Sequence, residues 1–260
     1  MSLPQPEQAK RTWNDVAATY DDYGLLPLGQ LESQLIEQAL GGDCTGLSVL
    51  DLGGGTGLHA REAINLGASG VDIVDISGEM LKTGQQQTEK SLSRESQDKI
   101  RFFEADVSKP FGHLALPLGG YDVVMGNWIF SSAGNMEVLE GIFRNIVAYL
   151  KPGGRFVGVR DADPWSPALV EKYGATFEWV KRIPGGVRYR CSLHCTPPIE
   201  FESACLETIY SGSTEIQERF GLVDVKNVPY EKARVMQEDP QFWEFFLEHP
   251  HLAVVHAVKR

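Results

Sequence analysis

The chain has 260 residues, of which 42% are hydrophobic and 23% charged, a composition typical of folded globular proteins rather than of disordered, collagen-like or coiled-coil chains. Its formal charge of -11 at pH 7 argues against a polyanion as the main partner, so we expect no nucleic-acid substrate. We expect a cytoplasmic enzyme without a membrane partner, because no apolar run approaches the roughly 20 residues that cross a bilayer, no secretory signal is evident, and four cysteines are too few for a disulfide framework.

Two helices are expected before the first strand. Apolar side chains recur at helical spacing at Val16 and Tyr20, and again at Leu31, Leu35 and Ile36. The glycines at 41 and 42 form a helix stop. We interpret residues 1–42 as a helical lid over the functional edge of the domain.

Between residues 43 and 160, short β-branched runs alternate with helical stretches. Strands are expected at Ser48–Leu52, Val71–Ile76, Ile100–Ala105, Tyr121–Asn127 and Arg155–Val159, and helices at Leu58–Leu66, after Ser77 and at Asn135–Leu150. Such alternation predicts parallel strands joined by crossover helices, hence an open α/β sheet that binds ligands at the carboxyl ends of its strands. This region is the predicted core of a single domain that spans residues 1–260.

Residues 161–221 break this rhythm and are predicted to form a substrate-side insertion. It should contain a helix near Ala168–Val180, extended strands at Val187–Leu193 and Glu200–Leu206, and a helix at Thr214–Phe220. Residues 222–260 should then complete the main sheet, with strands at Leu222–Val228 and Ala253–Val258.

The insertion also carries charged and aromatic side chains with two possible uses. Three arginines could receive an acidic substrate or form a solvated strand face: Arg182, Arg188 and Arg190. Four aromatic residues could wall a hydrophobic acceptor pocket or pack a helix: Trp165, Tyr173, Phe177 and Trp179.

Residues 49–57 read VLDLGGGTG, a strand that runs into a glycine-rich turn and then into a helix. Gly53, Gly55 and Gly57 let the backbone approach a ligand closely. The helix behind them offers free N–H groups and the positive end of its dipole to an anionic group. The spacing is not the dinucleotide-binding fingerprint, because Leu58 occupies the place of its last glycine, and no P-loop lysine follows. Glycines that serve only a tight turn are the alternative.

This motif resembles the glycine-rich loop of the class I (Rossmann-like) S-adenosylmethionine-dependent methyltransferases. Further segments that resemble the family follow in order: GVDIVDISGEML at 70–81, FEADV at 103–107, YDVVMGNW at 121–128 and KPGGRF at 151–156. WNDVAATYD at 13–21 resembles the lid helix of the small-molecule members. The resemblance implies an open, mostly parallel seven-stranded sheet with helices on both faces, an antiparallel last strand, the N-terminal lid and an insertion after strand five.

The resemblance also implies S-adenosylmethionine as cofactor and S-adenosylhomocysteine as product. Asp75 would accept hydrogen bonds from the ribose hydroxyls, and Asp106 with the Val107 N–H would meet the adenine. Asn127 would approach the methionine part, and Asp51 would act near its amino group or brace the loop. The other residues expected to contact the cofactor are Tyr20, Gly53, Gly55, Gly57 and Ile76, with packing of the lid helix as the alternative role of Tyr20.

The implied reaction is in-line displacement of the sulfonium methyl by a small-molecule acceptor, for which positioning supplies much of the acceleration. A phenol or carboxylic acid needs little more, whereas an alcohol acceptor would need a base, for which His194 is the preferred candidate. His59, in the first turn after the glycine loop, would lie close to the methionine end of the cofactor, and its preferred role is only to solvate that helix start. Cys191 and Cys195 would point away from His194 in an extended segment, so no metal site is expected.

Where relatives that methylate nucleobase or amide nitrogens carry Asn/Asp-Pro-Pro-Tyr/Phe, this chain has NWIF at 127–130, which argues against that chemistry and against RNA methylation. Two alternatives stay open. One is an enzyme of the same fold that uses the cofactor without consuming it, for a rearrangement or cyclisation, and the other is a non-catalytic cofactor-binding subunit. The sequence leaves open the acceptor, the methylated atom (oxygen, nitrogen, sulfur or carbon) and the oligomeric state.

Overall fold

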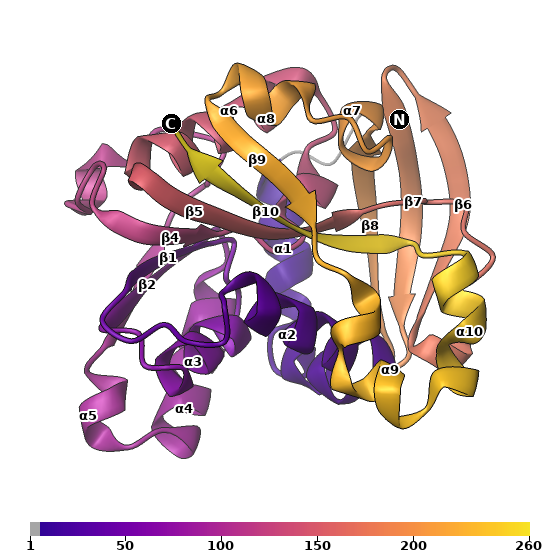
Figure 1. The fold of residues 1–260 in the computed structure, drawn as a ribbon, viewed down its shortest axis with the longest axis horizontal. Coiled ribbons are helices and arrows are strands. Elements are labelled where there is room, and N and C mark those ends of the chain that lie inside the picture. The colour runs from indigo at the N-terminus through magenta and orange to yellow at the C-terminus, as the bar shows by residue number, and fades with distance from the viewer. Residues whose placement is uncertain (1–5) are drawn as a thin grey trace.

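A seven-stranded sheet runs through the centre of the protein, which a computed structural model describes for residues 6–260 (Figure 1). Its strands, in spatial order, are β3 (Ile100–Glu104), β2 (Gly70–Asp75), β1 (Ser48–Leu52), β4 (Tyr121–Met125), β5 (Leu150–Asp161), β10 (Leu252–Lys259) and β9 (Leu222–Asn227). Strands β1 to β5 pair in parallel, and β10 runs antiparallel to both β5 and β9. The predicted Rossmann-like sheet with an antiparallel last strand is confirmed. Its strand order reverses between β1 and β4, the place where open α/β sheets bind ligands.

Helices cover both faces of this sheet (Figure 1). On one side lie α2 (Pro27–Ala39), α3 (Leu58–Asn65) and α4 (Gly78–Ser91), and on the other α6 (Met136–Tyr149) and α8 (Glu215–Arg219). The periodicity of α6 explains its place, because four of its apolar residues at helical spacing are buried: Leu139, Ile142, Phe143 and Ile146. The remaining helices are α1 (Pro6–Val16), α5 (Arg94–Gln97), α7 (Glu207–Tyr210), α9 (Arg234–Glu238) and α10 (Pro240–Glu248).

The inserted segment forms a second, three-stranded antiparallel sheet beside the first (Figure 1). Its strands are β6 (Ala175–Ile183), β7 (Gly186–Leu193) and β8 (Ile199–Leu206), paired in that order. Strands β7 and β8 confirm the strands predicted at Val187–Leu193 and Glu200–Leu206. The helix predicted near Ala168–Val180 is wrong: a single 3-10 turn, Glu171–Tyr173, ends at Gly174, whose φ of 109° stops a helix, and β6 begins.

The reason for that error lies in the apolar pattern of residues 170–180. Val170, Tyr173, Phe177 and Val180 recur at spacings of three and four, which is typical of a helix. In the structure this segment is a strand because it pairs with β7. Phe177 lies opposite Cys191, and its ring stacks on that of Tyr189 with 4.0 Å between the ring centroids.

The lid joins the two sheets. Trp13 of α1 contacts the Tyr20 ring at 5.7 Å and the Phe201 ring of β8 at 4.8 Å, centroid to centroid. Ser77, at the start of α4, donates a hydrogen bond to Asn14 Oδ1 at 2.7 Å. The first five residues of the predicted lid lie outside the described residues. No helix in the described part of the chain is both long and apolar enough to cross a membrane.

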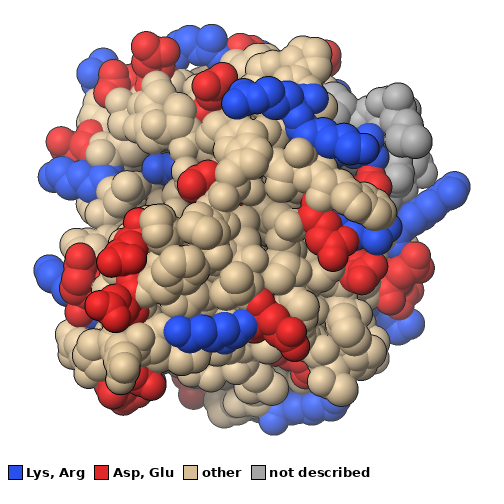
Figure 2. All heavy atoms as spheres, turned by 90° about the vertical axis from the view of Figure 1, so that its right-hand side faces the viewer, with Lys and Arg blue, Asp and Glu red and all other residues tan. Residues whose placement is uncertain are grey.

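The face that carries β6 and α10 has an uncharged centre, with charged side chains mostly around it (Figure 2). The inserted arginines lie among partners on the outer surface of the small sheet. Arg182 lies over the ring of Trp165, Arg190 over that of Trp179, and Arg188 pairs with Glu202. Of the two predicted roles of these arginines, their positions therefore favour the solvated strand face over a binding site for an acidic substrate.

Candidate active site

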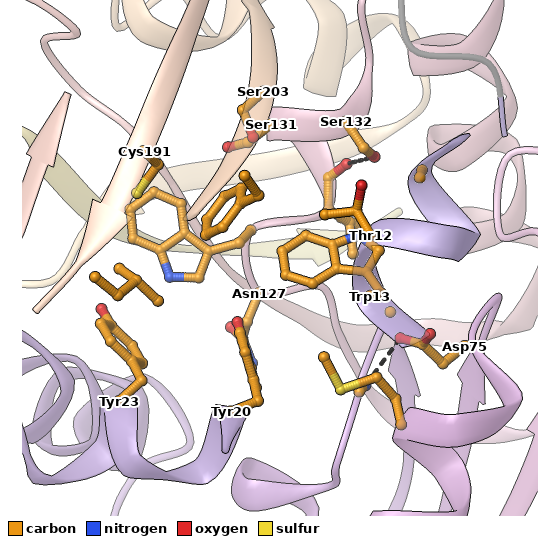
Figure 3. Close-up of a pocket in the computed structure, with 18 of the residues that line it drawn as sticks. Thr12, Trp13, Tyr20, Tyr23, Asp75, Asn127, Ser131, Ser132, Cys191 and Ser203 are labelled. Atoms are coloured by element: carbon orange, nitrogen blue, oxygen red, sulfur yellow. Dashed lines mark hydrogen bonds between the residues drawn. The ribbon is translucent and has the colours of Figure 1, made fainter. Parts of the chain in front are cut away.

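A cavity of about 260 Å³ lies at the carboxyl ends of β1, β2 and β4. The glycine loop and the acids at the strand ends line one side, and β6, β7 and β8 line the other. Figure 3 shows Asp75 and Asn127 from the main sheet, Trp13 from α1, and Cys191 from β7 turned toward the same space. Segments far apart in sequence therefore enclose a single cavity at the switch point of the sheet.

The glycine loop brings its backbone to the cavity edge. Gly53 and Gly55 line the cavity with φ values of 69° and 55°, which favour glycine. A Cβ at Gly53 would fall 2.4 Å from Cγ2 of Ile129. Gly57, with a φ of 75°, precedes α3 and lies outside the cavity lining, where a Cβ would meet Ile73 at 2.7 Å.

Asp75 ends β2 and holds the loop in place. Its Oδ2 accepts a hydrogen bond from the Gly55 N–H at 2.9 Å, and its Oδ1 accepts one from the Ser77 N–H at 2.8 Å. Burial raises the pKa of Asp75 to about 6, although these backbone donors oppose the shift. Each oxygen of an ionised carboxylate can accept a second hydrogen bond, so Asp75 can still receive hydroxyl donors from the cavity.

The ends of β1 and β4 present buried polar atoms that lack partners. Within the described residues, Oδ1 of Asp51 and both amide atoms of Asn127 make no hydrogen bond. Burial raises the pKa of Asp51 to about 7. An unpaired buried polar group costs about 1–3 kcal/mol, so these atoms call for a ligand that supplies both donors and acceptors.

A buried charge cluster adjoins this end of the cavity. Glu32 accepts hydrogen bonds from the Tyr23 hydroxyl at 2.8 Å and from the Trp128 indole N–H at 2.7 Å. Its other oxygen lies 3.2 Å from Nε2 of His59, whose Nδ1 lies 2.7 Å from Glu62. Burial alone favours neutral imidazole, but the two glutamates raise the pKa of His59 to about 10. The expected solvated His59 is therefore wrong, because the side chain is only 12% exposed and is held between two carboxylates.

The remaining predicted residues divide between the cavity and its surroundings. Tyr20 and Ile76 line the cavity, whereas Asp106 and Val107 do not. Oδ1 of Asp106 accepts hydrogen bonds from the N–H and hydroxyl of Ser108, which does line it. Because β3 pairs in parallel with β2, Asp75 and Asp106 both lie on the side of the sheet where these strands have their carboxyl ends.

The preferred base, His194, lies outside the cavity lining, and its Nε2 lies 3.0 Å from the Thr176 hydroxyl. Another histidine, His251, lines the cavity and is 2% exposed. The predicted antiparallel last strand was the sequence signal that could have indicated His251. Such a strand begins beside the carboxyl end of β5, as the pairing of Leu252 with Asp161 shows. Trp13 was missed as a cavity residue although it opens the lid motif.

No group of three or more potential metal-binding side chains occurs in the described part of the chain, and all four cysteines are free and buried. Cys191 lines the cavity, while burial raises the pKa of its thiol.

Comparison with known proteins gives three findings. Residues 49–154 match the family model of a methyltransferase domain. The ubiquinone/menaquinone biosynthesis C-methyltransferase of Pseudomonas paraeruginosa is 31% identical over 181 residues, which cover 67% of each chain. Two solved structures, a DhpI–SAM–HEP complex and the [4+2]-cyclase SpnF, each give a TM-score of 0.62. The first is 17% identical and covers 99% of both chains, and the second is 16% identical and covers 100% of this chain and 98% of its own.

Proposed function

Because the chain belongs to the class I S-adenosylmethionine-dependent methyltransferases, we propose that its cavity binds S-adenosylmethionine and that the enzyme methylates a small-molecule acceptor by in-line displacement. S-adenosylmethionine is the cofactor of the family and of this chain. When bound, it supplies an electrophilic methyl group on a sulfonium centre. The residues of the chain then have to bind it, orient the acceptor and exclude water.

The observation that carries the proposal is the set of unpaired polar atoms at the ends of β1 and β4. Asp51 lacks a donor, and Asn127 lacks both a donor and an acceptor. The methionine end of the cofactor has an ammonium and a carboxylate group, which together supply what these side chains lack. We assign this end of the cavity to the methionine part.

The adenosine part is assigned to the neighbouring strand ends. Asp75 would accept hydrogen bonds from the ribose hydroxyls, while the open backbone at Gly53 and Gly55 allows close approach. Asp106 and the Val107 N–H would meet the adenine at the next strand along, with Ser108 at the cavity edge.

The charge of the cavity wall supports a cationic ligand. Its lining residues in the described chain include five acids, Asp21, Glu32, Asp51, Asp75 and Glu202, against one cation, His59. Asp21 and Glu202 pair with Arg61 and Arg188, which lie outside the lining. Carboxylates near a sulfonium stabilise it, most strongly where water is excluded. Trp13 and Tyr20 would supply that exclusion from the lid side.

Titration calorimetry with S-adenosylhomocysteine tests the proposal. We expect binding to the wild type and at least tenfold weaker binding to Asp75→Ala, about 1.4 kcal/mol, the scale of one charge-assisted hydrogen bond. Asp98→Ala is the matched control, since Asp98 is exposed and pairs with Arg94 at the surface. A wild type that does not bind would refute the proposed function, and unchanged affinity in Asp75→Ala would remove Asp75 from its role.

A second candidate is a reaction that uses the cofactor without consuming it. One of the solved structures similar to this chain over its full length is that of a [4+2]-cyclase. Mass spectrometry separates the two functions. Methyl transfer predicts an acceptor heavier by one methyl group and an equal amount of S-adenosylhomocysteine, whereas cyclisation leaves the cofactor intact.

A further inference from the structure

His251 is a buried polar side chain on the acceptor side of the cavity. It immediately precedes β10, lines the cavity and is 2% exposed. Neither ring nitrogen has a hydrogen-bond partner within the described residues. Its ring lies 5.5 Å from the Phe246 ring and 6.4 Å from the Phe177 ring, centroid to centroid. A neutral imidazole has one donor and one acceptor, so both capacities are unused in apolar surroundings.

Three hydroxyl groups of the cavity lining already have acceptors for their protons. Tyr189 donates to Oδ1 of Asp161 at 3.0 Å, and Ser131 donates to Oδ2 of the same carboxylate at 2.8 Å. Ser132 donates to the carbonyl oxygen of Ile129 at 2.7 Å, as the dashed line in Figure 3 shows. The hydroxyl groups of Tyr189, Ser131 and Ser132 therefore have acceptors within the protein, whereas neither ring nitrogen of His251 has a partner in the described residues.

The wall opposite the glycine loop also lacks a positive charge. Its described lining residues are apolar or neutral apart from Glu202, which pairs with Arg188. Burial lowers the pKa of His251 to about 3, so the ring is uncharged at neutral pH. An anionic group against this wall would find no cation there to compensate its desolvation, which is costly, because the cations of the cavity, His59 and the sulfonium of the assigned cofactor, belong to the glycine-loop side.

We propose that His251 binds the methyl acceptor and that the acceptor is an uncharged, largely apolar molecule whose hydroxyl group hydrogen-bonds the His251 ring. The proposal rests on the proposed function, because the glycine-loop side of the cavity is assigned to the cofactor. Phe177 and Tyr189, stacked 4.0 Å apart by ring centroid, and the lid residue Trp13 supply the apolar walls. His251 then fixes the orientation of the acceptor through the one hydrogen bond that these walls do not provide.

The test uses three matched probes with the full-length protein saturated with S-adenosylhomocysteine: 2-naphthol, 2-naphthoate and naphthalene. They share a ring system and differ in having a neutral hydroxyl, a negative charge or no polar group. By ligand-observed NMR titration we expect 2-naphthol to bind about tenfold more tightly than either of the others.

His251→Phe should abolish this preference, so that 2-naphthol binds about tenfold more weakly and no better than naphthalene, while the affinity for S-adenosylhomocysteine is unchanged. His251→Gln, which keeps a donor and an acceptor, should retain part of it. His256→Phe is the matched control, because His256 lies five residues further along the chain, on β10, and outside the cavity lining.

Equal or tighter binding of 2-naphthoate would overturn the proposed acceptor class. No binding of 2-naphthol to the wild type, or an unchanged 2-naphthol affinity in His251→Phe, would overturn the role of His251. If His251→Phe does not fold, the role of His251 is tested by comparing the 2-naphthol affinity of His251→Gln with that of the wild type. Failure of the wild type to bind S-adenosylhomocysteine would instead refute the proposed function, so the two failures are distinguishable.

Discussion

Two carboxyl groups at the strand ends ionise close to neutral pH, which is unusual for aspartate. Burial raises the pKa of Asp75 to about 6 and that of Asp51 to about 7. Both line the cavity, and both are assigned hydrogen bonds to the cofactor that require the ionised form. Their protonation removes an acceptor and a negative charge from the site. The affinity for the cofactor should therefore depend on pH.

We predict that the affinity for S-adenosylhomocysteine falls as the pH is lowered from 8 to 5, most steeply below about pH 6, where Asp75 gains its proton. The ligand itself has no group that titrates in this range, so calorimetry across the range reports on the protein. In Asp75→Asn the affinity should be low throughout and the loss below pH 6 should disappear. A flat wild-type profile would contradict the assigned role of both acids.

At the scale of secondary-structure elements, α4 packs closely against the glycine loop through Gly84. A Cβ at this position would lie 2.7 Å from the carbonyl oxygen of Thr56 and 2.9 Å from the Phe102 ring. Backbone cannot yield as the end of a flexible side chain can, so α4 must shift away from the loop. This contact explains why α4 has a glycine in its middle.

We predict that Gly84→Ala lowers the free energy of unfolding by about 1–2 kcal/mol, because overpacking costs more than the roughly 1 kcal/mol gained in helix propensity. Denaturant unfolding measures the change. The matched control is Gly112→Ala, where a Cβ meets nothing within 4 Å, and it should be close to neutral. Equal stability of the two variants would show that α4 has room to adjust.

The lid helix α1 makes its contact with the cavity through Trp13. We predict that Trp13→Ala weakens S-adenosylhomocysteine binding about tenfold, since it removes the indole between Tyr20 and Phe201 and admits water. Trp179→Ala, which removes a 60% exposed indole on the outer surface, should leave binding unchanged. Calorimetry on both variants makes the comparison, and similar effects would show that the loss is not specific to the lid.

Elements with a strong local pattern were predictable from sequence. The strand, glycine turn and helix from residue 48 onward are set by β-branched runs, turn residues and apolar spacing, and the structure reproduces them. The segment from residue 168 to 180 was not predictable in this way, because its helical spacing is overridden by pairing with β7, a contact between distant parts of the chain. α10 went unpredicted, although Pro240 and the Asp239 cap mark its start.

The candidate site shows the same division. Asp51, Asp75 and Asn127 lie at the carboxyl ends of predicted strands, and sheet geometry brings them together. His251 could not be selected from its neighbours in sequence, because its place depends on the antiparallel pairing of β10 with β5. The insertion drew attention to His194, but the register of β6 and β7 leaves that side chain outside the cavity lining.

At the scale of the whole molecule, the cavity is enclosed by the main sheet, the lid and the small sheet together. A ligand bound there holds all three parts and stabilises the folded state by about 2.7 kcal/mol at a concentration one hundred times its dissociation constant. We predict that S-adenosylhomocysteine raises the melting temperature by about 5–10 °C in a single transition. Scanning fluorimetry with increasing ligand tests this. An unchanged melting temperature, or a ligand-insensitive second transition, would contradict it.

The two sides of the cavity come from different stretches of the chain. The assigned cofactor side is built mainly from strand ends between residues 48 and 127, whereas the opposite wall comes mostly from β6, β7 and β8. Since the small sheet is formed by one continuous segment, it can be exchanged as a unit while the strand ends assigned to the methyl donor are kept. Transplanting residues 175–206 between relatives is then a direct route to new acceptor preferences.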